Sequence, residues 1–247
     1  MTNYVLSYWL NPDAPDSERQ RLLEYFEMQR YTKAMFGAKQ LIVSNVAADG
    51  VIKFDEPPGF HPKHALLVKW LGLGQLLADG LHGNTVMHDH DTFVRRPIVV
   101  NDGVRAAWLY DHYISEQICA FPTQELGKVM HYNRLLRSFI ASDSVYELRR
   151  TDSGCIERHR GAISSESVQM YLKPFSACPR GLPIHTRDLV SFDIGSTHSL
   201  DTDTTVKHAN PIEPYVEAVH CHLGRGEPTR LLNEWLHPSI PGDMVAP

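Results

Sequence analysis

The stretch that decides the fold is residues 85–94, which read TVMHDHDTFV. Its first four residues form a short, largely apolar run that is typical of a buried strand. Two aspartates one residue apart, Asp89 and Asp91, follow at once. Open α/β sheets bind ligands at the carboxyl ends of their strands, and carboxylates at this spacing can converge on one hard cation. The alternative is an ordinary polar turn after a strand.

The residues before this stretch alternate between strand and helix patterns. Residues 4–10 and 41–46 are short apolar, β-branched and aromatic runs that predict buried strands. Residues 17–36, with Asp16 as the expected N-cap, and residues 64–81 carry apolar side chains at helical spacing. This order predicts βαβ units and an α/β fold with a parallel sheet.

The rest of the chain is less regular. Residues 49–62 are rich in glycine and proline and are predicted to form a loop. Further elements are predicted from local patterns, with helices over 106–118, 124–140 and 229–236 and strands over 168–175, 188–194 and 215–222.

Composition narrows the class of protein. The chain has 247 residues, of which 43% are hydrophobic and 21% charged, as in a soluble globular domain. Its net charge of -5 gives no overall basic excess for binding nucleic acid. The four cysteines form no CxxC pair, which favours reduced thiols and a cytoplasmic location. We expect no signal peptide, because residues 1–13 lack a basic start and an apolar core. We also expect no membrane span, because no apolar run reaches about 18 residues.

The stretch from Lys69–Trp70 through Leu76–Leu77 to the strand and the Asp-His-Asp turn resembles the core of GT-A-fold glycosyltransferases. In that family a helix with a lysine leads into an apolar strand, a D-x-D motif and then a small residue followed by apolar ones. The family also has a late histidine that completes the metal site, and residues 219–224, Val-His-Cys-His-Leu-Gly, stand about where it belongs. The resemblance covers roughly residues 3–100 and 215–228.

The resemblance implies one GT-A-like domain over residues 1–247, with a mixed, mainly parallel central sheet flanked by helices. About 1–100 would bind the nucleotide-sugar, about 101–228 would bind the acceptor, and 229–247 would form a C-terminal helix and tail. The implied activity is that of a hexosyl- or pentosyltransferase that uses Mn²⁺ or Mg²⁺ and a nucleotide-diphosphate sugar, most simply a UDP- or GDP-sugar. The acceptor stays open between a glycan, a protein, a small molecule and a modified nucleic acid.

The resemblance also assigns roles to individual residues. Asp91 would ligate the metal, and Asp89 would reach the ribose, or the metal through water. His222, which is followed closely by glycine, is the expected third ligand, with His220 as its neighbour. Lys69 would contact the donor phosphate or sugar, although a surface lysine of a helix is an equal alternative.

Other residues are weaker candidates. Residues 225–228, Arg-Gly-Glu-Pro, replace the family's Lys-Pro-Trp, and Arg225 could take over the role of the phosphate-binding cation. Tyr8 or Trp9 could stack on the donor base, with core packing as the alternative, and Asn45 could bind the base or ribose or simply form a turn.

The catalytic base stands in no recognisable motif. An inverting enzyme needs a carboxylate near the acceptor hydroxyl. Asp193, which follows an apolar run, is the preferred candidate, and the alternatives are Asp152, Glu157 and Asp188. A retaining and an inverting course both remain open. Two other functions are also open: a metal-dependent phosphoryl transferase or phosphatase, and a non-catalytic protein of the same fold that binds nucleotide-sugars.

Overall fold

The computed structural model describes residues 2–94, 96–100, 103–109 and 113–141, and beyond them seven separate strands. The elements up to residue 141 are β1 (Asn3–Tyr8), α1 (Asp16–Ala34), β2 (Gln40–Ser44), β3 (Val51–Lys53), the 3-10 helix η1 (Pro62–Leu67), α2 (Val68–Ala78), β4 (Thr85–His88), β5 (Thr92–Val94), β6 (Arg105–Leu109), β7 (Tyr113–Phe121), the 3-10 helix η2 (Thr123–Glu125) and α3 (Leu126–Ala141). The later strands are β8 (Tyr146–Arg150), β9 (Ile156–Arg160), β10 (Arg180–Gly181), β11 (Ile184–Asp188), β12 (Ile194–His198), β13 (Thr205–Ala209) and β14 (Ala218–His222).

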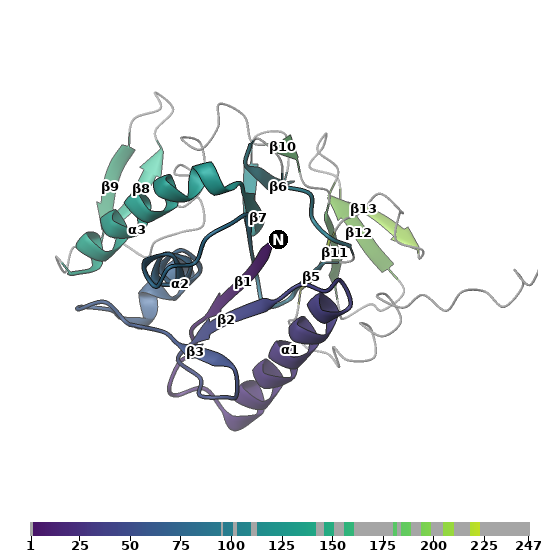
Figure 1. Ribbon diagram of the computed structural model, residues 1–247, viewed down its shortest axis with the longest axis horizontal. Coiled ribbons are helices and arrows are strands. Elements are labelled where there is room, and N and C mark those ends of the chain that lie inside the picture. The colour runs from purple at the N-terminus through teal and green to yellow at the C-terminus, as the bar shows by residue number, and fades with distance from the viewer. Residues whose placement is uncertain are drawn as a thin grey trace, which may run out of the picture.

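A seven-stranded sheet forms the centre of the protein, in the order β10-β6-β7-β4-β1-β2-β3. The neighbours β4, β1, β2 and β3 run parallel, and β6 is parallel to β10. The strand β7 is antiparallel to both β4 and β6. The expected fold class, an α/β protein with a mixed, mainly parallel sheet flanked by helices, is confirmed (Figure 1).

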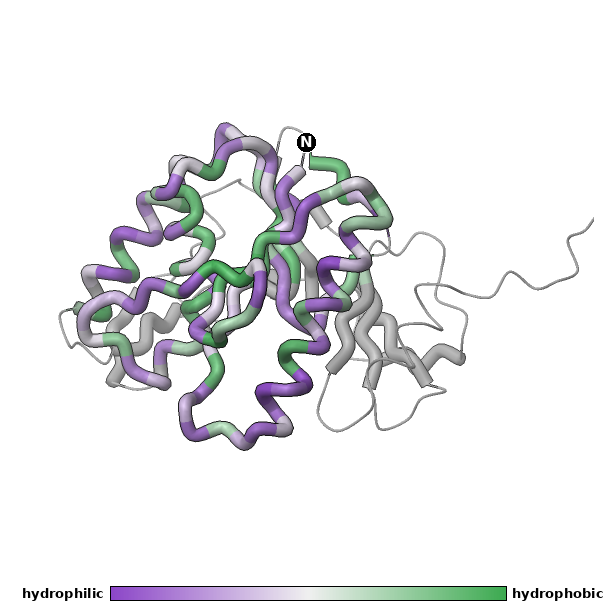
Figure 2. The backbone as a smooth tube through the Cα atoms, turned by 60° about the horizontal axis from the view of Figure 1, so that its bottom comes forward, coloured by the Kyte–Doolittle hydropathy of each residue, from purple (hydrophilic) through white to green (hydrophobic). Residues whose placement is uncertain are grey.

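Successive residues of a strand point to opposite faces of the sheet, and the core follows this rule. Val5 packs with α2 and α3 on one face, in a cluster that includes Trp70 and Val129. Its neighbour Leu6 packs with Leu22 and other residues of α1 on the opposite face. Helices therefore cover both faces of the parallel strands. Hydrophilic and hydrophobic residues alternate along these helices (Figure 2).

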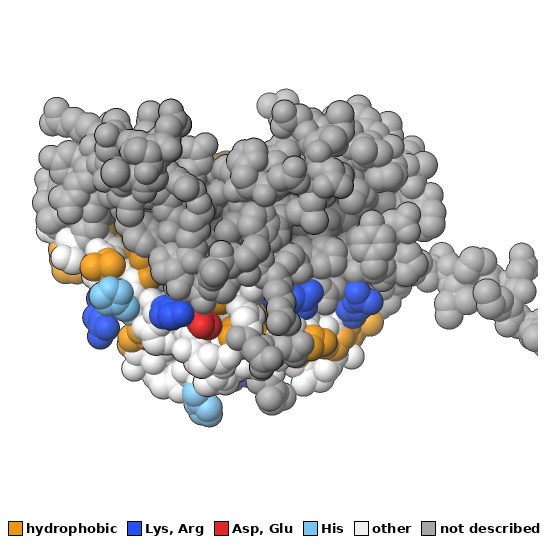
Figure 3. All heavy atoms as spheres, turned by 90° about the horizontal axis from the view of Figure 1, so that it is seen from above, with side chains coloured by type: hydrophobic (Ala, Val, Ile, Leu, Met, Phe, Trp, Pro, Cys, Tyr) orange, Lys and Arg blue, Asp and Glu red, His pale blue; other side chains and the backbone are white. Residues whose placement is uncertain are grey.

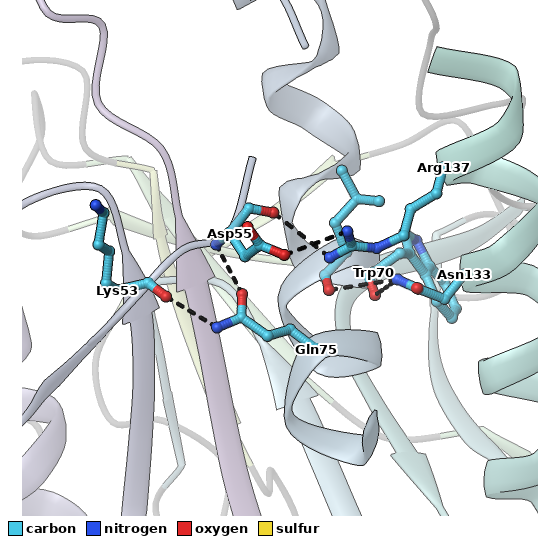
Figure 4. Close-up of polar contacts among 7 residues, drawn as sticks. Lys53, Asp55, Trp70, Gln75, Asn133 and Arg137 are labelled. Carbon is cyan, nitrogen blue, oxygen red and sulfur yellow. Dashed lines mark hydrogen bonds and ion pairs between the residues drawn. The ribbon is translucent and has the colours of Figure 1, made fainter. Parts of the chain in front are cut away.

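Helix α2 lies unusually close to its neighbours, and two glycines make this possible. A Cβ atom on Gly72 would lie 2.2 Å from the Ser7 hydroxyl oxygen on β1. One on Gly74 would lie 2.1 Å from the side chain of Asn133 on α3. Asn133 in turn donates hydrogen bonds to the carbonyl oxygens of Trp70 and Leu71, at 3.1 and 3.3 Å (Figure 4). These close contacts fix the position of α2 against β1 on one side and against α3 on the other.

A second sheet has the order β13-β12-β11-β14-β5. Its strand β14 pairs antiparallel with β5, so that His220 lies opposite Thr92 in the backbone register. The strand that carries the late histidines therefore lies beside the strand that follows the Asp-His-Asp turn. The strands β8 and β9 form a separate hairpin.

The predicted strands over 4–10, 41–46 and 85–88 and the predicted helices over 17–36, 64–81 and 124–140 are confirmed within a few residues. The strand predicted over 215–222 is confirmed as β14, and the one over 188–194 only touches the end of β11 and the start of β12. The predictions for 168–175 and 229–236 lie outside the described residues.

Three local predictions are wrong. Residues 106–109 and 113–118 belong to the strands β6 and β7 and not to a helix, because the chain there pairs into the central sheet beside β4. The loop predicted over 49–62 contains the edge strand β3, which at three residues is too short to give a recognisable strand pattern in the sequence. Asp16 is the first helical residue of α1, since Pro15, with φ at -64° and ψ at 152°, occupies the N-cap position.

No helix in the described ranges is long and apolar enough to cross a lipid bilayer. On the face seen from above, the described surface carries scattered Lys, Arg and His side chains and little acidic surface (Figure 3).

Candidate functional site

The Asp-His-Asp turn joins the two sheets at the carboxyl end of β4. His88 is the last residue of β4, and Thr92 is the first residue of β5. The turn is closed by a hydrogen bond of 3.1 Å from the Thr92 amide to the Asp89 carbonyl oxygen. Because β1 and β2 run parallel to β4, their carboxyl ends lie along the same edge of the sheet. This is the edge at which open α/β sheets bind ligands.

Lys69 contacts the first aspartate of the turn. Its ammonium nitrogen lies 2.6 Å from Asp89 Oδ1, and the two side chains are 13% and 20% exposed. Lys69 stands in the first turn of α2, and the close packing of that helix on β1 holds it at this position. The structure therefore brings a cation and a carboxylate together beside the turn, where both side chains remain partly exposed.

Asp91 is more deeply placed, with 9% of its surface exposed. The Nδ1 atom of His90 lies 3.9 Å from Asp91 Oδ1. Burial lowers the pKa of His90 to about 4, and nearby Lys69 and Arg21 act in the same direction. His90 is therefore neutral at pH 7 and does not compensate the charge of Asp91.

His88 lies behind the turn and is fully buried. Its Nδ1 atom is 2.8 Å from the Asp89 carbonyl oxygen and its Nε2 atom is 3.0 Å from Gln40 Oε1. Burial, the charge of Lys33 and other nearby cations keep the pKa of His88 well below its usual range, although the hydrogen bond to Asp89 acts in the opposite direction. The side chain thus links the turn to β2 from inside the core.

Tyr8 and Trp9, the two aromatic candidates for binding the donor base, lie in different environments. The Tyr8 ring packs against His90 with 4.4 Å between ring centroids, and burial followed by Glu18 and Asp91 raises its pKa. Trp9 donates from its indole nitrogen to Glu56 Oε1 at 2.6 Å and packs edge-on against Phe60. Tyr8 therefore borders the Asp-His-Asp turn, whereas Trp9 contributes to the core.

Asn45 uses both ends of its amide to hold the backbone of Leu10. Its Oδ1 accepts from the Leu10 amide and its Nδ2 donates to the Leu10 carbonyl, each at 2.8 Å. Asn45 also lines a cleft of about 440 Å³ at the carboxyl ends of β2 and β3, together with Lys53, Phe54, Asp55 and Glu56. Asn45 thus combines the turn role with a position at this cleft.

Two residues that the sequence did not single out hold the rim of this cleft (Figure 4). Gln75 of α2 accepts from the Asp55 amide at 2.9 Å and donates to the Lys53 carbonyl at 2.8 Å. Arg137 of α3 lies 3.5 Å from the Asp55 carboxylate and donates to its carbonyl at 3.4 Å. A glutamine within the apolar run of α2, residues 71–77, is the sequence signal that could have pointed to this contact.

The structure brings together Asp89, Asp91, Lys69 and Tyr8 around one turn. The backbone of β14 places His220 and His222 on a strand next to that turn. Asp193 and Arg225 lie outside the described residues. Among the side chains that the structure describes, no three from His, Cys, Asp and Glu gather closely enough to hold a metal ion.

Comparisons with known proteins find similarity among solved structures. No protein family matches the chain, and no curated protein matches it significantly. Among solved structures it is similar to a glycosyltransferase involved in the glycosylation of the major capsid of PBCV-1, with 11% identity over 94% of this chain and 97% of that chain and a TM-score of 0.46. It is also similar to a protein from Aquifex aeolicus VF5, with 11% identity over 69% of this chain and 90% of that chain and a TM-score of 0.36. The function proposed below rests on the residues of the site and not on these similarities.

Proposed function

We propose that this chain is a metal-dependent glycosyltransferase that moves a sugar from a nucleotide-diphosphate donor to an acceptor hydroxyl. The observation that carries the proposal is the group formed by Asp89, Asp91 and Lys69 at the carboxyl end of β4. Two carboxylates and an ammonium side by side provide both parts that a charged diphosphate needs, a cation site and a cationic side chain.

The carboxylate oxygens of Asp89 and Asp91 suit a hard divalent cation such as Mn²⁺ or Mg²⁺. Asp91 offers a nearly buried carboxylate, and Asp89 has a second oxygen beside the one that Lys69 contacts. His222 on β14 is proposed as the third ligand, and its nitrogen would favour Mn²⁺ over Mg²⁺. The ion, when bound, would neutralise the charge that develops on the diphosphate leaving group.

The side chains of the protein would do the remaining work. Lys69 would bind a donor phosphate from a position that its ion pair with Asp89 already fixes. Tyr8 would provide the wall of the site nearest the turn, and Arg225 would supply a second cation. Asn45, which lines the cleft at the carboxyl ends of β2 and β3, would contact the nucleoside part of the donor.

In an inverting reaction, the acceptor oxygen bonds to the anomeric carbon of the sugar while the bond from that carbon to the phosphate oxygen breaks. The bonding electron pair leaves with the nucleoside diphosphate, and the proton of the acceptor hydroxyl passes to a carboxylate. We propose Asp193 as that carboxylate, acting as general base.

The test is a panel of nucleotide-sugars, each incubated with the full chain and Mn²⁺, with nucleotide release as the readout. We expect release with at least one UDP- or GDP-sugar. Asp91→Asn should lower the rate by at least ~100-fold with an unchanged melting temperature, because the loss of a metal ligand removes several kcal/mol of transition-state stabilisation. Asp79→Asn, at the far end of α2 from Lys69, is the matched control and should leave the rate unchanged.

Other outcomes would favour the other functions. Tight binding of a nucleotide-sugar without turnover would indicate a non-catalytic binding protein. Hydrolysis of phosphate esters without sugar transfer would indicate a phosphoryl transferase. Full activity in a well-folded Asp91→Asn variant would refute the metal assignment.

The late histidines can be tested separately through the Mn²⁺ concentration needed for half-maximal activity. His222→Ala should raise this concentration, and His220→Ala should change it less. The reverse order would exchange the two assignments, and no change in either variant would remove β14 from the metal site.

A further inference from the structure

Two polar side chains of α1, Gln29 and Lys33, are fully buried behind the Asp-His-Asp turn, each with no exposed surface. They lie four residues apart and so occupy the same face of the helix. Burying an amide, and still more an ammonium group, costs free energy unless each group has a partner. A pair of this kind in the interior therefore needs an explanation.

Gln29 is bonded to the backbone on both sides of Asp91. Its Nε2 group donates to the His90 carbonyl oxygen at 2.8 Å and to the Thr92 carbonyl oxygen at 2.9 Å. An amide group has two N–H donors, and both are used here. The peptide segment that carries Asp91 is thus held at its two ends by one side chain from another element.

Lys33 determines which way the Gln29 amide points. Its ammonium nitrogen donates to Gln29 Oε1 at 2.9 Å and lies 5.4 Å from the ring centroid of Tyr4. While Lys33 is protonated, its ammonium group has donors and no acceptor, so only the oxygen end of the amide can face it. The nitrogen end must then face the two carbonyl groups of the turn.

We infer that Gln29 is a positioning residue for Asp91, kept in its working orientation by Lys33. The inference rests on the proposed function, because it gives the pair the task of holding the metal-binding turn in place before the cation arrives. Side chains that orient a ligand in this way add to metal affinity, since the ligand loses less freedom on binding. Neither Gln29 nor Lys33 would touch the metal itself.

The experiment measures the dissociation constant of Mn²⁺ for the full chain by calorimetry, with no donor present, so that activity is not the readout. The central variant is the double substitution Gln29→Met/Lys33→Met, which keeps side-chain size and removes the amide and the charge together. We expect the dissociation constant to rise about 10- to 100-fold, the usual effect of losing a group that orients a ligand.

The matched control is Thr32→Val on the same helix. Thr32 is buried and donates to the Gln29 carbonyl at 3.0 Å, but it makes no hydrogen bond to the turn. We expect this variant to lose a buried hydrogen bond and to bind Mn²⁺ as the wild type does. If Thr32→Val weakened binding as much as the double variant, the effect would come from general destabilisation, and the inference would be wrong.

The single variant Lys33→Met keeps the test decisive if the double variant does not fold. It leaves both bonds from Gln29 available but removes the group that orients the amide, so we expect a smaller rise, of about threefold, on the same principle. Wild-type affinity in every folded variant would overturn the inference and leave the proposed function intact. Absence of Mn²⁺ binding in the wild type, or equal binding by Asp91→Asn, would instead overturn the metal site itself.

Discussion

Replacing Lys33 by methionine should change the way in which the stability of the protein depends on pH. Lys33 has no exposed surface, and burial lowers its pKa from 10.5 to about 7. The unfolded chain, in which the pKa is near 10.5, binds the proton more tightly than the folded protein. The wild type therefore becomes more stable as the pH rises through this window, and below pH 7 it carries the full cost of the buried charge.

The size of the effect follows from the same two pKa values. A pH unit within the window corresponds to about 1.4 kcal/mol. Between pH 7 and pH 9 the contribution of Lys33 to the free energy of unfolding should rise by about 2 kcal/mol, and over the whole window by about 5 kcal/mol. The variant lacks this contribution, so its stability relative to that of the wild type should fall by the same amounts.

The assay is urea unfolding of both proteins at half-unit steps from pH 6.5 to pH 9.5. The quantity to plot is the difference between their free energies of unfolding, because all other titrating groups are common to both proteins and cancel. Lys39→Met, at an exposed lysine beyond the end of α1, is the matched control and should give a constant difference. A constant difference for Lys33→Met as well would refute the argument that Lys33 is buried as a costly cation.

Three further predictions concern packing, the cleft and the metal. Gly72→Ala should lower the free energy of unfolding by about 1–3 kcal/mol, because its methyl group would meet Ser7. Gly127→Ala, where a Cβ atom would have nothing within 4 Å, should raise it by up to about 1 kcal/mol. Urea unfolding measures both variants, and equal effects would contradict the close packing of α2. Gln75→Leu should speed the cleavage by trypsin after Lys53, since it frees that segment, and unchanged cleavage would show that the rim is held by other contacts. Chelation by EDTA should leave the melting temperature unchanged, because the core does not need an ion to fold; a large fall would indicate a structural metal.

The first half of the fold could be predicted because its elements carry strong local patterns. The strands that include Val5 and Ile42 are short apolar runs with turn residues after them, and α2 is an apolar segment of helical length. Residues 106–118 could not be predicted in the same way. Their apolar residues fit a helical period over a short window, and pairing with β4 decides the outcome.

The residues of the candidate site likewise divide into those that the sequence predicts and those that it does not. Asp89 and Asp91 could be found because a spacing of two and a preceding strand are visible in the sequence, and Lys69 because the resemblance to GT-A-fold glycosyltransferases implies a lysine on the preceding helix. Gln29 and Lys33 could not, because polar residues of a helix usually face water. The inward face of α1 begins with apolar residues such as Leu22 and ends with polar ones, and only the position of the turn beneath it explains the change.

The pairing of β5 with β14 has a consequence for the order in which the site is built during synthesis. The two aspartates leave the ribosome long before β14, the strand that pairs beside them. Contacts between such distant segments form late, because a long loop must close before they contribute. A nascent chain that stops short of β14 would therefore hold both aspartates and Lys69 without the neighbouring strand, so that the proposed site is expected to be complete only after β14 has been made.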